Sequence, residues 1–231
     1  MSIRQLAGTT AIVTGASRGF GQAISASLVR EGAYVVGVAR SAGPLNELRD
    51  QLGERFTPEI ADITDPDLAR RLVSQHQPRT IVLNAGATPP MGPISQQTWE
   101  TFTTNWNTDV RHVFNFAREA LTMPLDSGSV VLSFSSGAAL RGSPLSGGYS
   151  GAKATVRYIS AYAGSESSRG SLGIRFVSVL PQLTPATKLG TVGVETYAGD
   201  AGLTVDAFVE RMGTVLSPEK VATSVVTLVT D

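Results

Sequence analysis

Short apolar runs alternate with longer helical stretches along this chain, and that alternation most constrains its fold. Several of these runs are rich in Val, Ile and Leu without polar alternation, which is typical of strands buried on both faces of a parallel sheet. The predicted strands are Thr10–Thr14, Tyr34–Ala39, Phe56–Ala61, Thr80–Leu83, Val130–Ser135 and Ile174–Leu180. The predicted helices are Gly19–Glu31, Pro44–Leu52, Pro66–Gln75, Thr98–Thr122, Gly148–Ser168 and Pro218–Val229. The sequence therefore predicts an α/β fold, a doubly wound Rossmann-type parallel sheet flanked by helices.

Length and composition narrow the classes of function. A chain of 231 residues suits one domain, so we expect a single domain over residues 1–231. Nineteen Lys and Arg balance nineteen Asp and Glu, without the basic excess typical of nucleic-acid binding. The chain contains no cysteine, and His76 and His112 stand outside any cluster of metal ligands, so we expect surface or helix-packing histidines and no metal. Without a secretory leader or a long apolar run, we expect a cytoplasmic protein with no membrane partner.

The first predicted strand runs directly into a glycine-rich turn that opens a helix. This turn, Thr14–Gly21, reads Thr-Gly-Ala-Ser-Arg-Gly-Phe-Gly. Glycine permits positive φ and lets the backbone approach a pyrophosphate closely. The N-terminus of the following helix offers free N–H groups and the positive end of its dipole. The strand before and the helix after make dinucleotide binding the expected role of this turn.

The spacing Gly-x-x-x-Gly-x-Gly, together with two later motifs, resembles the short-chain dehydrogenase/reductase family from about Leu6 to the C-terminus. Asn84-Ala85-Gly86 follows the fourth strand and Asp62-Ile63 follows the third. The resemblance implies that these motifs bind the cofactor, with Asp62 near the adenine. The residues implied in cofactor binding are Gly15, Ser17, Arg18, Gly19, Phe20, Gly21, Arg40, Asp62, Ile63, Asn84, Ala85, Gly86, Tyr149, Lys153, Pro181 and Thr184.

The second strand ends in Val38-Ala39-Arg40-Ser41, without the acid that usually binds the ribose 2′-OH of NAD. Arg40 and Arg18 could both reach a 2′-phosphate, and the planar fork of arginine suits that group. The missing acid also removes a repulsion against phosphate. These residues favour NADP(H) over NAD(H), although surface arginines also occur by chance.

Tyr149 and Lys153 stand four residues apart near the start of a predicted helix, which puts them on one face. A nearby ammonium stabilises a phenolate and lowers the tyrosine pKa from about 10. By resemblance, Tyr149 exchanges a proton with the substrate oxygen, Lys153 lowers its pKa and binds the nicotinamide ribose, and Ser136 orients the substrate oxygen.

Two positions depart from the family's pattern. By resemblance, the fourth helix should carry an asparagine that supports a water in the proton relay. When the register is taken from Phe114, Asp109 stands at this position. Asn107 is the competing position. We place Asp109 in the catalytic set and expect it to attract Lys153 and shift the pH optimum. The family's Pro-Gly after the sixth strand is Pro181-Gln182 here. Gln182 could face the substrate, and we choose Thr184 as the nicotinamide contact, while the identity of that threonine stays open.

The segment after the sixth strand is the least regular part of the sequence. Thr184–Ala201 is rich in Gly, Thr and Ala, and we expect a substrate loop over residues 184–210. Members of the family that the chain resembles commonly add a seventh strand after the last predicted helix; this strand is missing or not included in this chain, so an exposed sheet edge could result. A homodimer or homotetramer is expected, and the tetramer contact made through that strand is in doubt.

Together these features predict an NADP(H)-dependent oxidoreductase that moves a hydride between the nicotinamide and a small carbonyl/alcohol substrate. Two alternatives stay open. One is a non-redox enzyme of the same fold, such as a dehydratase or epimerase, and the other is a non-enzymatic NADP(H)-sensing module. Retention of Ser136, Tyr149 and Lys153 together argues against the sensor, because a sensor needs only the glycine turn.

Overall fold

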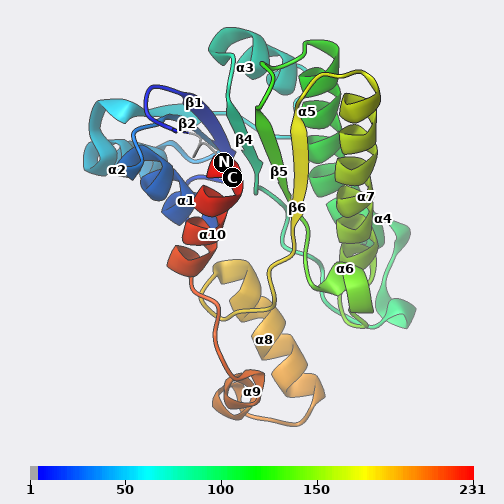
Figure 1. Ribbon diagram of the computed structural model, residues 1–231. Helices are drawn as coiled ribbons and strands as arrows, with labels where there is room; N and C mark the ends of the chain where they lie inside the picture. The colour runs from blue at the N-terminus through cyan, green and yellow to red at the C-terminus, as the bar shows by residue number, and fades with distance from the viewer. Residues whose placement is uncertain (1–4) are drawn as a thin grey trace.

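The computed structural model describes residues 5–231, in which six strands form one parallel sheet (Figure 1). Their order across the sheet is β3-β2-β1-β4-β5-β6. Strands β2 and β3 therefore lie on one side of β1, and β4, β5 and β6 lie on its other side. The strands are β1 (Thr10–Thr14), β2 (Tyr34–Ala39), β3 (Phe56–Ile60), β4 (Thr80–Leu83), β5 (Val130–Phe134) and β6 (Arg175–Val179). The predicted fold class is confirmed, and the predicted strand ends differ from these by at most one residue.

Helices cover both faces of the sheet because successive strand residues point to opposite sides. Val13 of β1 packs with α1 (Gly19–Arg30), α2 (Ala42–Leu52) and α10 (Pro218–Thr230). Ile12, its neighbour in the chain, packs on the other side with α3 (Leu68–His76), α5 (Arg111–Thr122) and α7 (Gly147–Arg169). Two apolar cores therefore enclose the sheet, which explains its unbroken apolar strands.

The predicted helix Thr98–Thr122 is interrupted, which corrects that prediction. Thr98 caps α4 (Trp99–Asn105) through a reciprocal capping box with Thr101. A π-helical turn, η3 (Trp106–Val110), then joins α4 to α5. A π turn accommodates an extra residue, and such turns are frequent at functional sites. This stretch contains neither Pro nor Gly, so no helix-breaking residue marks the interruption, and the open choice between Asp109 and Asn107 was its only sign in the sequence.

The prediction of an irregular segment at Thr184–Ala201 is wrong, and the 184–210 region is mostly helical. It contains α8 (Lys188–Asp200) and α9 (Val205–Met212), whose N-caps are Thr187 and Thr204. Gly and β-branched residues lower helix propensity, but these caps and the burial of Val194 and Ala198 outweigh it. Figure 1 shows α8 and α9 beyond the carboxyl ends of the strands.

The remaining elements are the last helix, the edge strand β6 and three short helices. Ser217 accepts a hydrogen bond from the backbone N–H of Lys220 and Pro218 begins α10, as the sequence predicts. β6 lies at an edge of the described sheet, with every residue half-buried. In the described residues, no helix has the length and apolarity needed to cross a membrane. The short helices are η1 (Gly53–Arg55), η2 (Ile94–Gln96) and α6 (Ala138–Arg141).

Candidate active site

The turn after β1 is shaped by glycines that no other residue replaces without strain. Gly15 and Gly19 have φ of 70° and 55°. A Cβ on Gly21 would lie 2.2 Å from the carbonyl oxygen of Gly15. The backbone is thus folded tightly onto itself at the first turn of α1, and its surface is left free of side chains. This shape fits a pyrophosphate held at a helix N-terminus.

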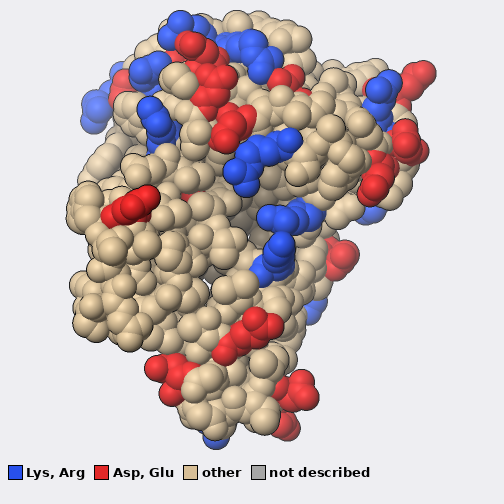
Figure 2. All heavy atoms as spheres, turned by 180° about the vertical axis from the view of Figure 1, so that it is seen from behind, with Lys and Arg blue, Asp and Glu red and all other residues tan. Residues whose placement is uncertain are grey.

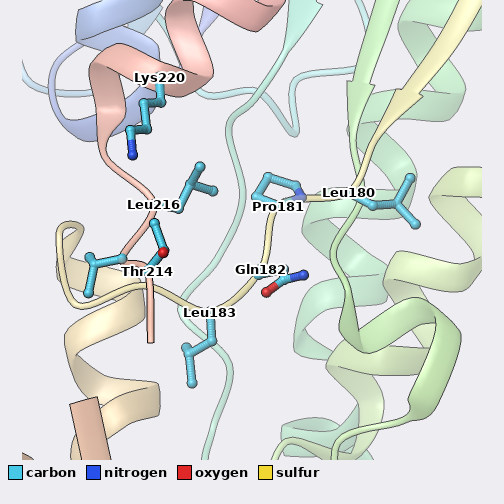
Figure 3. Close-up of a pocket in the computed structure, with 8 residues that line it drawn as sticks. Leu180, Pro181, Gln182, Leu183, Thr214, Leu216 and Lys220 are labelled. Carbon is cyan, nitrogen blue, oxygen red and sulfur yellow. The ribbon is translucent and has the colours of Figure 1, made fainter. Parts of the chain in front are cut away.

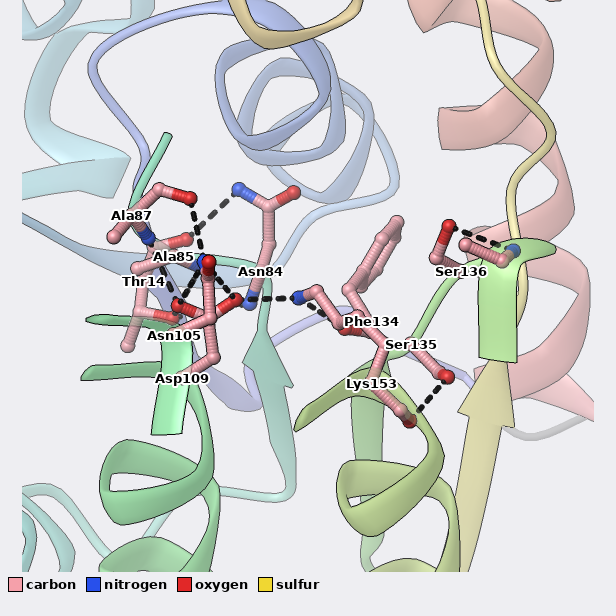
Figure 4. A network of polar contacts seen from close by, with 11 residues as sticks. Thr14, Asn84, Ala85, Ala87, Asn105, Asp109, Phe134, Ser135, Ser136 and Lys153 are labelled. Atoms are coloured by element: carbon pink, nitrogen blue, oxygen red, sulfur yellow. Dashed lines mark hydrogen bonds and ion pairs between the residues drawn. The ribbon is translucent and has the colours of Figure 1, made fainter. Parts of the chain in front are cut away.

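The turns after β1 and β4 are tied together by polar contacts (Figure 4). The Asn84 side chain donates from Nδ2 to the Thr14 carbonyl at 3.1 Å. The Thr14 hydroxyl accepts from the backbone N–H groups of Asn84 and Ala85, both at 3.1 Å. A Cβ on Gly15 would lie 2.8 Å from Asn84 Nδ2. The fold therefore brings the two predicted cofactor motifs into direct contact at the point where the sheet order reverses.

The other predicted cofactor residues surround this junction. Arg18 is the N-cap of α1 and is exposed, as is Arg40 just after β2. Hydrogen bonds from the backbone and hydroxyl of Thr64 lower the pKa of Asp62, and the positive charge of Arg40 lowers it further. Arg40 and Asp62 therefore lie near each other at the ends of β2 and β3. Figure 2 shows basic side chains gathered beside a hollow near the middle of one face.

Three more predicted cofactor residues occupy less exposed positions. Ser17 is half-buried within the turn. Phe20 packs against Phe134 of β5, with ring centroids 6.3 Å apart. Ile63 is half-buried against the second core. Phe20 and Ile63 therefore anchor their segments through apolar packing.

Tyr149 and Lys153 lie on one face of α7, near the end of β5. The Lys153 Nζ atom is 5.7 Å from the centroid of the Tyr149 ring. Lys153 is buried, whereas Tyr149 is half-buried. Ser136 follows β5, is also half-buried, and accepts a hydrogen bond from the backbone N–H of Ala138 at 3.2 Å. A partly exposed phenol beside a buried ammonium has the composition of a proton-transfer site.

Asp109 lies inside this site, in the π turn between α4 and α5. Its Oδ2 is 3.0 Å from Lys153 Nζ, and its Oδ1 accepts from the backbone N–H of Ala87 at 2.8 Å. Asn107, the competing residue, is exposed, and its side chain donates to the hydroxyl of Thr103 at 3.5 Å. The structure therefore places Asp109, and not Asn107, beside Lys153.

Burial and charge act on two titratable groups here. Burial lowers the pKa of Lys153, but the charges of Asp109 and Tyr149 and the hydrogen bond to Asp109 raise it by more, so the net shift is upward. Burial, helped by the positive charge of Lys153, lowers the pKa of His112 to about 3. His112 is fully buried, so the helix-packing prediction for this residue is the correct one. Its neutral ring packs edge-on against Phe116, with centroids 5.3 Å apart.

Sequence reasoning missed two residues of this network and one residue of α8 that contacts the segment before α7. Asn105 donates from Nδ2 to the Ala87 carbonyl at 2.8 Å. The Ser135 hydroxyl donates to the Lys153 carbonyl at 2.7 Å. Tyr197 of α8 pairs its hydroxyl with that of Ser143 at 2.5 Å. Asn105 stands four residues before Asp109, the spacing of one helical face, which was the only sequence signal for any of them.

The loop after β6 carries the two predicted residues Pro181 and Thr184. Thr184 is buried, and its hydroxyl donates to the Leu216 carbonyl at 2.6 Å. Thr187 instead approaches the glycine turn, because a Cβ on Gly19 would lie 3.5 Å from its Cγ2. Gln182 is exposed in a pocket of about 290 Å³ shown in Figure 3. The pocket is lined by Leu180, Pro181, Gln182, Leu183, Thr214, Val215, Leu216 and Lys220.

Comparison with known proteins agrees with this geometry. The family described as short chain dehydrogenase matches residues 9–196, which include the glycine turn and α7. The chain belongs to the short-chain dehydrogenase family. This short-chain dehydrogenase is accordingly an oxidoreductase of alcohol or carbonyl substrates that uses a nicotinamide cofactor.

Several named relatives are similar over most of this short-chain dehydrogenase. Serine 3-dehydrogenase of Agrobacterium fabrum is 31% identical over 182 residues, which are 74% of this chain and 70% of that protein. Versicolorin reductase stcU of Emericella nidulans is 31% identical over 66% of this chain and 61% of its own length. A crystal structure of 3-ketoacyl-(acyl-carrier-protein) reductase from Brucella melitensis, complexed with NADH, superposes with a TM-score of 0.79 at 24% identity. That match covers 96% of this chain and 91% of the other, and it supports the fold.

Proposed function

We propose that this protein is an NADP(H)-dependent oxidoreductase of a small carbonyl/alcohol pair, with Tyr149 as its general acid/base. The observation that carries the proposal is the buried ammonium of Lys153, 5.7 Å from the Tyr149 ring centroid. A positive charge near a phenol favours the phenolate and so eases proton exchange with the substrate oxygen. Ser136, half-buried at the end of β5, would donate a hydrogen bond to the substrate oxygen.

The shape of the turns supports a dinucleotide across the carboxyl ends of the strands. Gly15, Gly19 and Gly21 leave the backbone bare at the start of α1, where N–H groups would hold the pyrophosphate. Asn84–Gly86 and Asp62-Ile63 would border the ribose and adenine. The bound cofactor supplies or accepts the hydride, and the protein supplies placement and the proton. We propose that Thr187, which faces Gly19, contacts the nicotinamide end of the cofactor in place of Thr184.

The preference for NADP(H) rests on Arg18 and Arg40. Both side chains are exposed at the rim of the turn, and Arg40 lies close enough to Asp62 to lower its pKa. A guanidinium can bind a 2′-phosphate with two parallel hydrogen bonds, and such charge-assisted bonds contribute about 1.5–3 kcal/mol. NADH lacks that phosphate and would gain nothing from either side chain.

Fluorescence titration with NADPH and, separately, NADH tests this preference. We expect tighter binding of NADPH, and we expect Arg40→Ala to weaken NADPH binding by about 10-fold or more while leaving NADH binding unchanged. Arg49→Ala, at an exposed arginine of α2, is the matched control. Equal affinities for both cofactors would refute the NADP(H) assignment, and binding of neither would refute the dinucleotide site.

A substrate screen then tests the redox assignment. The relatives' names include a hydroxy amino acid dehydrogenase and a reductase of a fungal compound, so the panel should contain 3-hydroxy acids and aromatic ketones. Turnover should consume NADPH in proportion to product, and Tyr149→Phe should slow it by about 10²–10⁴-fold. Product without net change in NADPH would favour a dehydratase or epimerase instead.

We also propose that the protein forms a homodimer through α5 and α7. Phe114 of α5 and Tyr158 and Tyr162 of α7 are between 50% and 67% exposed. In Figure 2, the side of the molecule that carries α4, α5 and α7 bears few charged side chains. Exposed aromatic side chains without surrounding charge are typical of protein interfaces. Light scattering should give twice the monomer mass, and Tyr162→Lys should reduce it; a monomer at all concentrations would refute the dimer.

A further inference from the structure

The ammonium of Lys153 is held by acceptors other than Tyr149. It donates to the Phe134 carbonyl at 2.9 Å and lies 3.0 Å from Asp109 Oδ2 (Figure 4). A lysine ammonium has three N–H donors, so these two partners leave one for anything else in the site. Lys153 is 6% exposed and Asp109 is 1% exposed, which means that water screens this ion pair little. The pair is therefore a fixed part of the site.

The carboxylate of Asp109 is also held on its other side. Its Oδ1 accepts from the Ala87 N–H at 2.8 Å, and Asn105 Nδ2 lies 3.4 Å from both of its oxygens. A Cβ on Gly86 would lie 2.7 Å from Oδ2, so the turn after β4 closes over the carboxylate. The π turn carries Asp109 into this position. Asp109 thus connects the cofactor-side turn to Lys153 and cannot swing away.

No other charge is arranged to offset Asp109 among the described neighbours of Lys153. The titratable groups that act on Lys153 are Asp109 from the π turn and Tyr149 from its own helix. His112 of α5 also lies within range of its charge but is neutral, since burial lowers the pKa of its ring to about 3. Because the Asp109 carboxylate lies 3.0 Å from the ammonium, it partly cancels the field that the ammonium exerts on Tyr149.

We propose that Asp109 is a positioning residue that holds Lys153 against the Phe134 carbonyl and partly neutralises it, so that Tyr149 ionises at higher pH than it would beside an uncompensated lysine. This inference rests on the proposed role of Tyr149. It implies that oxidation of an alcohol, which needs the phenolate, becomes fast only at alkaline pH. Reduction of a carbonyl, which needs the protonated phenol, keeps its rate over a wider pH range.

The direct test is a tyrosinate absorbance titration from about pH 6 to about pH 11, without substrate or cofactor. Subtracting the curve of Tyr149→Phe removes the contribution of the other tyrosines. We expect Asp109→Asn, which keeps an acceptor for Ala87, to lower the pKa of Tyr149 by about one unit, a tenfold change in ionisation. Glu119→Gln removes another buried acid from the same helical segment, paired with Arg118, and should leave this pKa unchanged.

A second variant keeps the inference testable if Asp109→Asn does not fold. Asp109→Asn combined with Lys153→Met removes both charges at once and leaves neither one buried alone. If the pair is already largely neutral, this double variant should titrate Tyr149 within about half a unit of the unmodified protein.

An unchanged or raised Tyr149 pKa in Asp109→Asn would overturn the inference, because Asp109 would then serve mainly to keep Lys153 protonated. A large rise in the double variant would overturn it as well. Neither readout uses turnover. A shifted Tyr149 pKa in a protein that never oxidises NADPH would therefore reject the proposed redox function and leave the role of Asp109 intact.

Discussion

Two regions beyond the carboxyl ends of the strands are built in opposite ways. The cofactor side, formed by the turns after β1 and β4, is held by backbone groups and by glycines that allow close approach, as at Gly21 and Gly15. The opposite side, formed by α8 and α9 after β6, has one such close approach, at Gly190 beside the Thr184 carbonyl, and is otherwise held by side-chain contacts. Tyr197 of α8 accepts from the Leu145 N–H at 3.3 Å, and Thr184 donates to the Leu216 carbonyl at 2.6 Å.

This difference separates a region whose shape must stay constant, the turns after β1 and β4, from a region whose contacts can vary, α8 and α9. A backbone cradle offers one shape, which suits a ligand such as a dinucleotide whose pyrophosphate is always the same. Side-chain contacts can be exchanged one at a time without refolding the sheet, so α8 and α9 suit a region that selects substrates. The comparison predicts that substitutions of the cofactor-side glycines cost more than the removal of single side-chain contacts near α8.

The largest effect is expected for Gly21→Ala. Its Cβ would overlap the Gly15 carbonyl oxygen at 2.2 Å, so the glycine turn must shift. We expect a loss of about 3 kcal/mol in the free energy of unfolding, measured in urea, and a loss of NADPH binding. Gly43→Ala in α2, which has nothing within 4 Å, is the control and should be neutral or stabilising. Equal effects of the two variants would break the comparison.

A second test uses His112, which lies beside Ala85 below the cofactor side. Its pKa falls from 6.5 to about 3 on folding, so below about pH 6.5 the unfolded chain binds a proton that the folded chain excludes. The stability that neutral His112 contributes is therefore fully present above about pH 6.5 and is lost as the pH falls below it. Between about pH 7.5 and about pH 5, we expect the protein to lose about 2 kcal/mol more than His112→Leu, measured by urea unfolding. Parallel pH curves for the two proteins would show that His112 is protonated when folded.

The third test concerns Thr184 and sharpens the boundary between the two sides. Thr184→Val removes the donor to the Leu216 carbonyl, and we expect a loss of about 1–2 kcal/mol in thermal or urea unfolding with an unchanged affinity for NADPH. Thr227→Val, at an exposed threonine of α10, is the control. A large loss of NADPH affinity in Thr184→Val would return this residue to the role of nicotinamide contact.

The smallest effect is expected for Tyr197→Phe. This change removes the hydroxyl that pairs with Ser143 and accepts from Leu145, between α8 and the segment before α7. We expect about 1 kcal/mol of local destabilisation, seen as faster hydrogen exchange in α8 with the sheet unaffected. Tyr34→Phe, at a 50% exposed position of β2, is the control and should leave the exchange of α8 unchanged. Faster exchange throughout the sheet would mean that α8 is not a separate unit.

The parts of this protein that could be predicted from its sequence are those in which neighbouring residues determine the outcome. Apolar runs indicated most of the strands, and the Gly15–Gly21 spacing located the turn that fits a pyrophosphate. The four-residue spacing of Tyr149 and Lys153 predicted their shared helix face. In each case the signal lies within a few residues, because strand burial, glycine φ and helical periodicity are local properties of the chain.

Tertiary structure alone decided the features that depend on residues far apart. The sequence favoured Asp109 over Asn107 but left Asn107 open, because the π turn that brings Asp109 to Ala87 and Lys153 is not visible in the sequence. The helix α8 forms from glycine-rich sequence because Val194 and Ala198 are buried. His112 is neutral because of what surrounds it in the folded core. Burial and charge pairing arise only when distant segments meet, and they outweigh the weak local preferences of these residues.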